Sequence, residues 1–361
     1  MVSVSRRSLL ALGAALPVLG HLDWAVASPA PTASGPVLLN YNESPYGPSK
    51  AALEAMQTGM AASGRYPYPH MYALAALFAR QQGINEDNVA VFAGSMAALR
   101  YAVLAFTSPA RGLVMATPSY EVPRQAAESN KAAVHEVDLN AQHAHDVPAM
   151  LAANPQAGML YLCNPNNPTG TLTPTEAIRQ ALANKPEGSV LVVDEAYIDF
   201  CDAPSCVSWV KDHDDVLVLR TFSKIYGMAG ARLGLAIGHP RLLERLAVFG
   251  GDNVPAGTSL LGAQASLEDV KLLGQRKALN ASLRDETIAW LKGRGYACTA
   301  SQSNCFMIDV RQPAEQVVER LAVQQVLVGR VWKNWPQWVR VTVGNKQQMQ
   351  RFCEVFAAQI A

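Results

Sequence analysis

The stretch VLVLRTFSK, residues 216–224, says most about the fold of this chain. Its first four residues are all aliphatic, which predicts a strand at 216–219 that is buried on both faces. The polar residues Thr221, Ser223 and Lys224 follow this strand, and open α/β sheets bind their ligands just beyond the carboxyl ends of the strands. The stretch therefore predicts a buried strand that delivers Lys224 to a ligand site.

Similar apolar runs occur on both sides of this stretch. They are Val89–Phe92, Leu113–Ala116, Val134–Val137, Met159–Leu162, Val190–Val193 and Gly234–Ile237. Helical patterns lie between several of them, including Ser95–Phe106 and Pro174–Ala183. Seven strands with helical crossovers predict an α/β fold in which a seven-stranded, mostly parallel sheet is sandwiched by helices.

The pattern changes after about residue 250. A long amphipathic helix is expected from Lys271 to Arg294, and a last helix from about Lys346. Between them we expect strands at Phe306–Val310, Gln325–Val328 and Val339–Val343. We therefore predict a large domain at residues 63–250, a smaller α+β domain at 251–361, and a segment at 28–62 that packs with the small domain.

The first 27 residues have the features of an export signal. Arg6 and Arg7 precede a moderately apolar run at residues 9–20, and Ala25-Val26-Ala27 offers a cleavage site with small residues. This order predicts a twin-arginine signal peptide, and hence a mature protein in the periplasm or outside the cell. The alternative is an N-terminus that is frayed and not cleaved.

Composition excludes several classes of protein. Half of the residues are hydrophobic, 16% are charged and the net charge is +1, which argues against a disordered or nucleic-acid-binding chain. We expect no stable membrane association, because no stretch beyond the N-terminus has the length and apolarity of a membrane span. The six cysteines lack the spacing of a zinc site. We prefer separate thiols to a Cys201–Cys206 bridge, and a solvated loop to a metal site at His143, His145 and Asp146.

Two charged residues follow apolar runs in a way that suggests catalysis. Lys224, if desolvated, loses its proton more readily and becomes a nucleophile toward an aldehyde. Asp194 ends the run SVLVVD, where a buried carboxylate needs a cation such as a protonated pyridine nitrogen. Taken singly, Lys224 is typical of a solvated loop and Asp194 of a helix cap.

Further motifs follow other predicted strands. The turn at residues 164–170, NPNNPTG, leaves Asn167 free to donate to a ring oxygen that Tyr197 can also reach, although such a turn can be purely structural. Gly94, Ser95 and Met96 lie between a strand and a helix, where backbone N–H groups bind anions. Ser223 and Arg232 add a hydroxyl and a fixed charge for a phosphate. Tyr120 is a candidate to stack on a cofactor ring, or else a core aromatic residue.

In this order the motifs resemble the fold-type-I aminotransferases, and within them the histidinol-phosphate aminotransferase group. The resemblance extends from about residue 39 to residue 344. It implies pyridoxal phosphate as cofactor, a Schiff base on Lys224, and Asp194 at the pyridine nitrogen. It also implies that Asn167 and Tyr197 hold the phenolic oxygen and that Ser95, Ser223 and Arg232 hold the phosphate.

The same resemblance implies substrate residues and an oligomeric state. Arg340 matches the arginine that binds the substrate's acidic group, Arg330 matches a second arginine of this group, and Asn42 is a further substrate candidate. Without the resemblance, Arg330 would be taken for a surface residue. Tyr66 matches a tyrosine that reaches the phosphate of the neighbouring subunit, so a homodimer is implied.

Transfer of an amino group from an amino acid or amino metabolite to a 2-oxo acid is the expected reaction, with Lys224 as general base. A decarboxylase, lyase or racemase would use the same residues, and a non-catalytic protein that binds the cofactor or an amine is a third alternative. Met96-Ala97 stands where the group has Asp-Glu, and the segment with Trp332, Trp335 and Trp338 is short. Together with export, these departures favour a substrate other than histidinol phosphate. The tryptophans either line an apolar pocket or pack the small domain.

Overall fold

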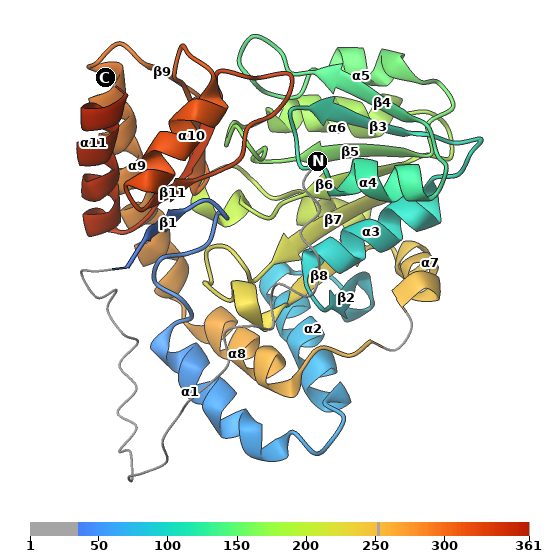
Figure 1. Cartoon of the computed structure of the whole chain (residues 1–361). Coiled ribbons are helices and arrows are strands. Elements are labelled where there is room, and N and C mark those ends of the chain that lie inside the picture. The colour runs from blue at the N-terminus through green and yellow to red at the C-terminus, as the bar shows by residue number, and fades with distance from the viewer. Residues whose placement is uncertain (1–34, 251–252, 361) are drawn as a thin grey trace, which may run out of the picture. The chain divides into compact units, whose positions relative to one another are not determined.

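The structure is a computed structural model, and it describes residues 35–250 and 253–360 (Figure 1). The predicted signal peptide, residues 1–27, lies outside the described residues. No helix in the described ranges is both long and apolar enough to cross a membrane. Residues 36–361 form one compact unit, so the predicted boundary near residue 250 stays a prediction.

The centre of this unit is a seven-stranded sheet. Its strands are β2 (Val89–Phe92), β3 (Leu113–Thr117), β4 (Val134–Asp138), β5 (Met159–Cys163), β6 (Val190–Asp194), β7 (Val216–Thr221) and β8 (Gly234–Gly238). The spatial order is β2-β8-β7-β6-β5-β3-β4. Strand β8 is antiparallel to β2 and β7, and the remaining neighbours are parallel. The predicted α/β fold with a mostly parallel sheet is confirmed.

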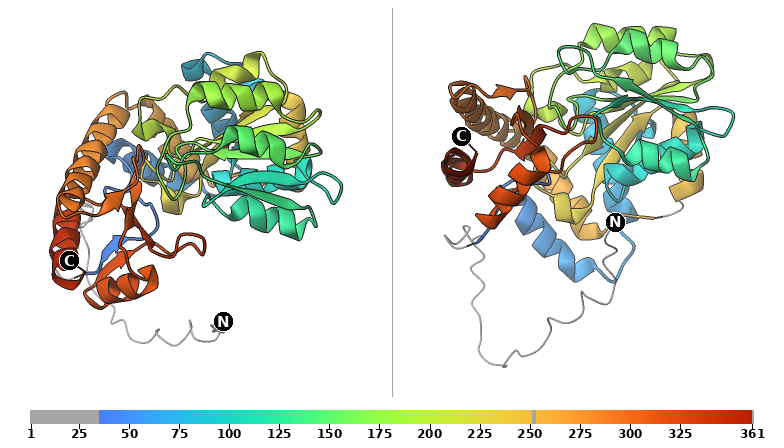
Figure 2. Two further views of the ribbon diagram at one scale, coloured as in Figure 1. Left: turned by 90° about the horizontal axis from the view of Figure 1, so that it is seen from above. Right: turned by 45° about the horizontal axis from the view of Figure 1, so that its top comes forward.

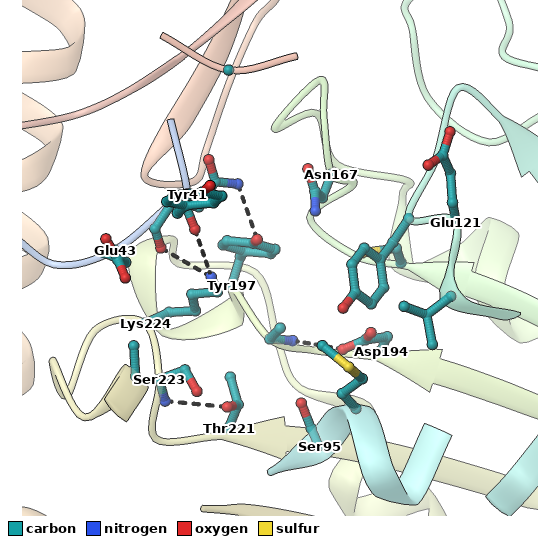
Figure 3. Close-up of a pocket in the computed structure, with 18 of the residues that line it drawn as sticks. Tyr41, Glu43, Ser95, Glu121, Asn167, Asp194, Tyr197, Thr221, Ser223 and Lys224 are labelled. Atoms are coloured by element: carbon teal, nitrogen blue, oxygen red, sulfur yellow. Dashed lines mark hydrogen bonds between the residues drawn. The ribbon is translucent and has the colours of Figure 1, made fainter. Parts of the chain in front are cut away.

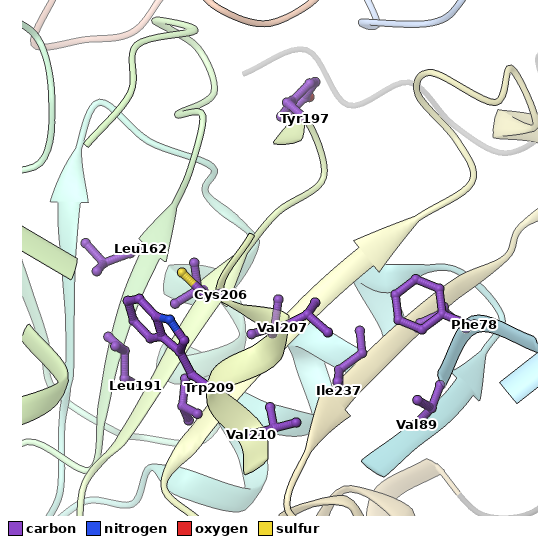
Figure 4. Close-up of a cluster of buried hydrophobic side chains, with 14 of the residues drawn as sticks. Phe78, Val89, Leu162, Leu191, Tyr197, Cys206, Val207, Trp209, Val210 and Ile237 are labelled. Carbon is purple, nitrogen blue, oxygen red and sulfur yellow. The ribbon is translucent and has the colours of Figure 1, made fainter. Parts of the chain in front are cut away.

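Helices cover both faces of this sheet (Figure 2). One face carries α2 (Tyr68–Gln82), α5 (Val147–Ala153), α6 (Thr175–Asn184) and α8 (Gly257–Glu268), and the other α3 (Ser95–Phe106), α4 (Val122–Ser129) and α7 (Pro240–Gly250). In β6, Leu191 and Val193 point to the first layer and Val190 and Val192 to the second. Because both faces are covered, central strands such as β6 are nearly continuous apolar runs (Figure 4).

A smaller three-stranded antiparallel sheet follows, in the order β12-β10-β9. Its strands are β9 (Ala297–Cys298), β10 (Cys305–Asp309) and β12 (Trp338–Thr342), and α9 (Leu272–Lys292), α10 (Ala314–Val323) and α11 (Lys346–Gln359) share its core. Strand β10 begins and ends one residue earlier than predicted, because Cys305 pairs with Thr342 and Asp309 with Trp338. The last helix begins at Lys346 as expected, where a capping box between Asn345 and Gln348 starts it.

The segment before the large sheet contacts both parts of the chain. Strand β1 (Val37–Leu39) pairs in parallel with β11 (Val326–Val328), whereas α1 (Lys50–Gly59) packs on α8. Helix α8 also places Leu260 and Ala263 in the core beside the large sheet. Short 3₁₀ helices complete the described structure at Met60–Ala62, Glu86–Asn88, Ile198–Phe200, Cys206–Lys211 and Ala229–Ala231.

The topology gathers four chain segments at one edge of the large sheet. Strands β3, β5, β6 and β7 are parallel, and they end at Thr117, Cys163, Asp194 and Thr221. Every predicted motif around the cofactor other than Gly94–Met96 and Tyr66 follows one of these four ends. The motifs are therefore close in space although up to about a hundred residues separate them.

Candidate active site

A cavity of about 860 Å³ lies at this edge (Figure 3). Its walls come from the ends of the large-sheet strands, from residues 40–43, and from the segment between β11 and β12. It brings together most of the predicted site residues, namely Asn42, Ser95, Met96, Tyr120, Asn167, Asp194, Tyr197, Ser223, Lys224, Arg232, Arg330 and Arg340. Gly94 and Tyr66 are not in its lining.

Lys224 projects into the cavity from the loop after β7. Its Nζ donates to the carbonyl oxygens of Asn42 (3.0 Å) and Tyr41 (3.3 Å) (Figure 3). Burial lowers the pKa of Lys224 to about 8, and the charge of Arg340 also lowers this pKa. Cys305, Glu43 and Asp194 act in the opposite direction. The neutral amine is therefore accessible near physiological pH, as a nucleophile or base requires.

Asp194 is the last residue of β6 and is buried. Its carboxylate accepts a hydrogen bond from the Tyr161 hydroxyl (3.0 Å) and from the Ala196 backbone N–H (3.2 Å). Burial raises the pKa of Asp194 to about 6, while these two hydrogen bonds and the charge of Lys224 lower this pKa. Within residues 35–250 and 253–360 no cation forms an ion pair with Asp194. A carboxylate that is buried, unpaired among these residues and exposed to a cavity is suited to bind a cationic group of a ligand.

Asn42 connects the residues expected around the ring oxygen. Its Nδ2 donates to the Tyr197 hydroxyl (3.0 Å), and its Oδ1 accepts from Thr342 (3.1 Å). Asn167 Oδ1 accepts from Arg340 Nη1 at 2.9 Å, which leaves the Asn167 amide N–H groups available. Asn42 itself has φ 54°, a conformation that asparagine tolerates better than most residues. One network thus holds the N-terminal segment, the turn after β5 and strand β12 around the cavity.

The opposite wall has the features of an anion site. Ser95 begins α3, and Ser223 lies opposite on the loop after β7. Arg232 Nη1 is 3.5 Å from the Ser223 hydroxyl. Gly94 has φ 92°, and a Cβ built on it would be 2.4 Å from Arg232 Nη2. Gly94 is therefore needed at this position, because it lets the guanidinium lie against the start of the helix.

The two predicted substrate arginines also line the cavity. Arg340 is buried, and Arg330 is half-exposed and paired with Glu121 (2.8 Å). Both guanidinium groups lie over the ring of Trp332, at 5.5 Å and 5.0 Å from its centroid. Trp335 and Trp338 instead flank His143. Trp332 thus supports the cavity, and the other two tryptophans fasten its segment to the loop before α5.

Sequence reasoning missed Tyr161 and Glu121. Tyr161 is the one polar side chain in the β5 run MLYLC, and it reaches Asp194 on the neighbouring strand diagonally. Strand alternation could have suggested this contact. Nothing local marks Glu121, because its partner Arg330 is more than two hundred residues away.

His145 and Asp146, considered above as metal ligands, make structural contacts instead. Asp146 caps α5, and the buried His145 contacts the Cys163 backbone through Nε2. No metal-ligating group of three or more His, Cys, Asp or Glu side chains occurs in the described ranges. All six cysteines are free thiols, including Cys201 and Cys206.

Comparison with known proteins agrees with this geometry. The family model for aminotransferase class I and II matches residues 34–356. The chain belongs to the class I and II aminotransferases. A histidinol-phosphate aminotransferase of Symbiobacterium thermophilum is 34% identical over 327 residues, which cover 90% of each chain.

Solved structures of this family have the same fold. A putative histidinol-phosphate aminotransferase of Erwinia carotovora atroseptica aligns with a TM-score of 0.86 and 27% identity over 90% of this chain and 95% of that one. The histidinol-phosphate aminotransferase of Sinorhizobium meliloti, solved with pyridoxal 5′-phosphate, has a TM-score of 0.83 and 24% identity over 89% and 90% of the two chains.

Family membership confirms the predicted enzyme class and cofactor: this aminotransferase is a pyridoxal-phosphate enzyme. The residues of the cavity fit that cofactor. Lys224 offers an amine of lowered pKa, and Asp194 a buried carboxylate without a cation. Gly94 keeps the space in which Arg232 meets the start of α3. The assignment of single residues to parts of the cofactor stays a prediction.

Proposed function

We propose that this aminotransferase moves an amino group between an amino acid, or a metabolite with a primary amine, and a 2-oxo acid. The position of Lys224 carries the proposal. Its amine lies in the cavity beside the Asn42 carbonyl, and its pKa of about 8 lets it exchange protons near neutral pH.

Each wall of the cavity suits one part of the cofactor. Lys224 would hold it covalently, Asp194 would face the ring nitrogen, and Asn167 and Tyr197 would face the ring oxygen. Ser95, Ser223 and Arg232 would hold the phosphate, and Tyr120 would cover the ring. When bound, the cofactor supplies an electron sink for the electron pair left when the substrate loses its α-proton.

Lys224 is the proposed proton carrier. Once its amine is free, Nζ takes the proton from the substrate's Cα, and the carbonyls of Asn42 and Tyr41 keep Nζ in place. The Tyr197 ring lies 5.6 Å from Nζ, and its face attracts the positive charge that the amine gains with the proton. Arg340 would bind the α-carboxylate, since a planar guanidinium can fix the orientation of that group.

Single-turnover experiments test the reaction type. Purified enzyme, saturated with cofactor, is mixed with one amino acid at a time while the visible absorbance and the products are followed. We expect loss of the absorbance band, formation of a 2-oxo acid and retention of the nitrogen on the enzyme as pyridoxamine phosphate. Release of carbon dioxide, ammonia or the enantiomer would instead indicate a decarboxylase, a lyase or a racemase. Binding with no product from any donor would indicate a non-catalytic protein.

Histidinol phosphate is not the substrate we propose, although the matched relatives bear its name. Export would separate the enzyme from a phosphorylated intermediate of the cytoplasm, and Met96-Ala97 replaces the Asp-Glu expected after Ser95. A kcat/KM for histidinol phosphate above that of every amino acid tested would contradict this proposal.

We also propose a homodimer and an exported location. Tyr66 is 83% exposed and lies outside the cavity lining, which suits a residue that acts on a partner subunit. Light scattering on the purified protein tests the oligomeric state. For export, Arg6→Lys with Arg7→Lys is expected to keep the protein in the cytoplasmic fraction, because the paired arginines are the recognised feature of the signal.

A further inference from the structure

One ion pair crosses the outer part of the cavity. Glu121 comes from the loop between β3 and α4, and Arg330 from the segment between β11 and β12. Their Oε2 and Nη1 atoms are 2.8 Å apart. Figure 3 shows Glu121 and Lys224 at opposite sides of the cavity. Glu121 therefore lies across the cavity from the reacting amine, and we place the end of a bound amino acid's side chain there.

The carboxylate of Glu121 also contacts a second arginine. Its other oxygen, Oε1, is 3.2 Å from Arg124, and Arg124 also faces Glu136 at 3.9 Å. The four groups carry two positive and two negative charges. Arg330 thus meets the cavity with its charge already balanced, whereas a free arginine would attract an anion.

The surroundings of the pair favour uncharged side chains. Val122, Val318 and Val328 also line the cavity. A donor with an anionic tail would have to displace Glu121 from Arg330 or lie beside its carboxylate, and like charges placed side by side disfavour binding. A donor with a neutral tail requires neither change.

We propose that Glu121 is a specificity-determining residue: by pairing with Arg330, it makes the site select amino donors with uncharged side chains over donors with anionic ones. The selection rests on the proposed function, because it concerns the donor of that same reaction. The pairing leaves Arg340 as the cation for the α-carboxylate and keeps Arg330 from binding a second anion.

Glutamine and glutamate test this directly, because they have nearly the same shape and differ in the charge of the tail. For the wild-type enzyme saturated with cofactor, kcat/KM for glutamine is expected to exceed that for glutamate by about tenfold. O-phosphoserine, with two charges on its tail, is expected to be poorer than glutamate. Glu121→Gln frees Arg330, so the ratio of glutamine to glutamate falls by about tenfold or inverts.

Two further variants show whether the pair is the cause. Glu121→Gln combined with Arg330→Gln removes both charges, so the gain for glutamate is lost again. Glu136→Gln is the matched control: it makes the same charge change next to Arg124, but Glu136 does not line the cavity, so the ratio stays at the wild-type value. A wild-type preference for glutamate, or an equal ratio in wild type and Glu121→Gln, overturns the proposal.

A failure of the proposed function can be told apart from a failure of this inference. If neither an amino acid nor a metabolite with a primary amine reacts, the proposed function is wrong, and charge selection is then measured by binding alone. Glutarate and its half-amide, glutaramate, lack the amino group and are compared by calorimetry with the holoenzyme. Tighter binding of glutaramate by wild type, reversed in Glu121→Gln, supports the role of Glu121, and tighter binding of glutarate by wild type contradicts it.

Discussion

At the scale of single residues, the site depends on side chains that shift the pKa of their neighbours. Tyr161 is the clearest case, because it is fully buried and its hydroxyl donates to Asp194 at 3.0 Å. Burial raises the pKa of Asp194, and this hydrogen bond opposes the effect. Tyr161 therefore helps to keep Asp194 ionised at neutral pH, the state that a protonated ring nitrogen needs.

Tyr161→Phe should raise the pKa of Asp194 above its wild-type value of about 6. Because the carboxylate is charged only above its pKa, cofactor affinity in the variant is expected to decline from a higher pH as the pH is lowered. Affinity at pH 7 should fall about threefold to tenfold, as for loss of one hydrogen bond to a charged group. Fluorescence titration of the apoenzyme with cofactor between pH 5 and 8.5 measures this. Identical pH profiles in the two proteins would mean that Tyr161 only fills space.

At the scale of elements, two short pieces of backbone shape the cavity. One is the start of α3, where Gly94 lets Arg232 approach. The other is the segment between β11 and β12, in which Trp332 bridges to Trp335 and supports two arginines. Each piece positions charges that lie on a different element.

Gly94→Ala should weaken the phosphate site. The new Cβ would meet Arg232 Nη2 at 2.4 Å, and φ 92° is strained for alanine, so the helix start or the arginine must shift. Cofactor affinity of the apoenzyme, measured by equilibrium dialysis, is expected to fall by about tenfold or more. The matched control is Gly274→Ala in α9, where a Cβ meets nothing within 4 Å, and it should bind cofactor like wild type.

Trp332→Leu should raise KM for the amino donor more than it lowers kcat, because it removes the ring beneath Arg340 and Arg330. The expected rise in KM is about threefold to tenfold, in keeping with loss of cation–π contacts. Trp332→Phe keeps an aromatic face and should restore most of the affinity. Trp338→Phe is the control, because Trp338 faces His143. Equal losses in the Phe and Leu variants would argue that the ring is not a platform for the arginines.

At the scale of the whole molecule, the acidity of Lys224 is set by remote parts of the chain. Burial in the folded protein lowers its pKa most, Arg340 from β12 lowers it further, and Glu43 from the N-terminal segment and Asp194 from the large sheet raise it. Only the assembled fold brings these charges to one lysine.

Arg340→Gln is therefore expected to raise the pKa of Lys224 above about 8. Cofactor capture requires the neutral amine, so the capture rate of the apoenzyme should rise with pH through this pKa, and the midpoint should move upward in the variant. Stopped-flow absorbance between pH 6 and 10 gives both midpoints. Arg330→Gln serves as control, since its charge is paired with Glu121. A midpoint that does not move, or moves down, would show that Arg340 has no influence on Lys224.

Sequence and structure agree best where local chemistry decides the outcome. Short β-branched runs such as VLVL and VLVV favour strands buried on both faces, so the large sheet and the edge that carries Asp194 and Lys224 follow from the sequence. Predicted strands and helices that bear the site motifs differ from the observed ones by at most two residues. Differences of this size arise where a partner strand extends the pairing, as β8 does for β7 up to Thr221.

The sequence by itself determined the fold class, the lysine and most of the cofactor side of the cavity, because these depend on motifs that are continuous in the chain. Only the tertiary structure decided how the substrate side is charged. Glu121 and Arg330 are 209 positions apart in the sequence, and no local pattern couples them. Electrostatic pairing depends on distance in space. For Glu121 and Arg330, that distance is fixed by how the segment between β11 and β12 lies against the loop between β3 and α4.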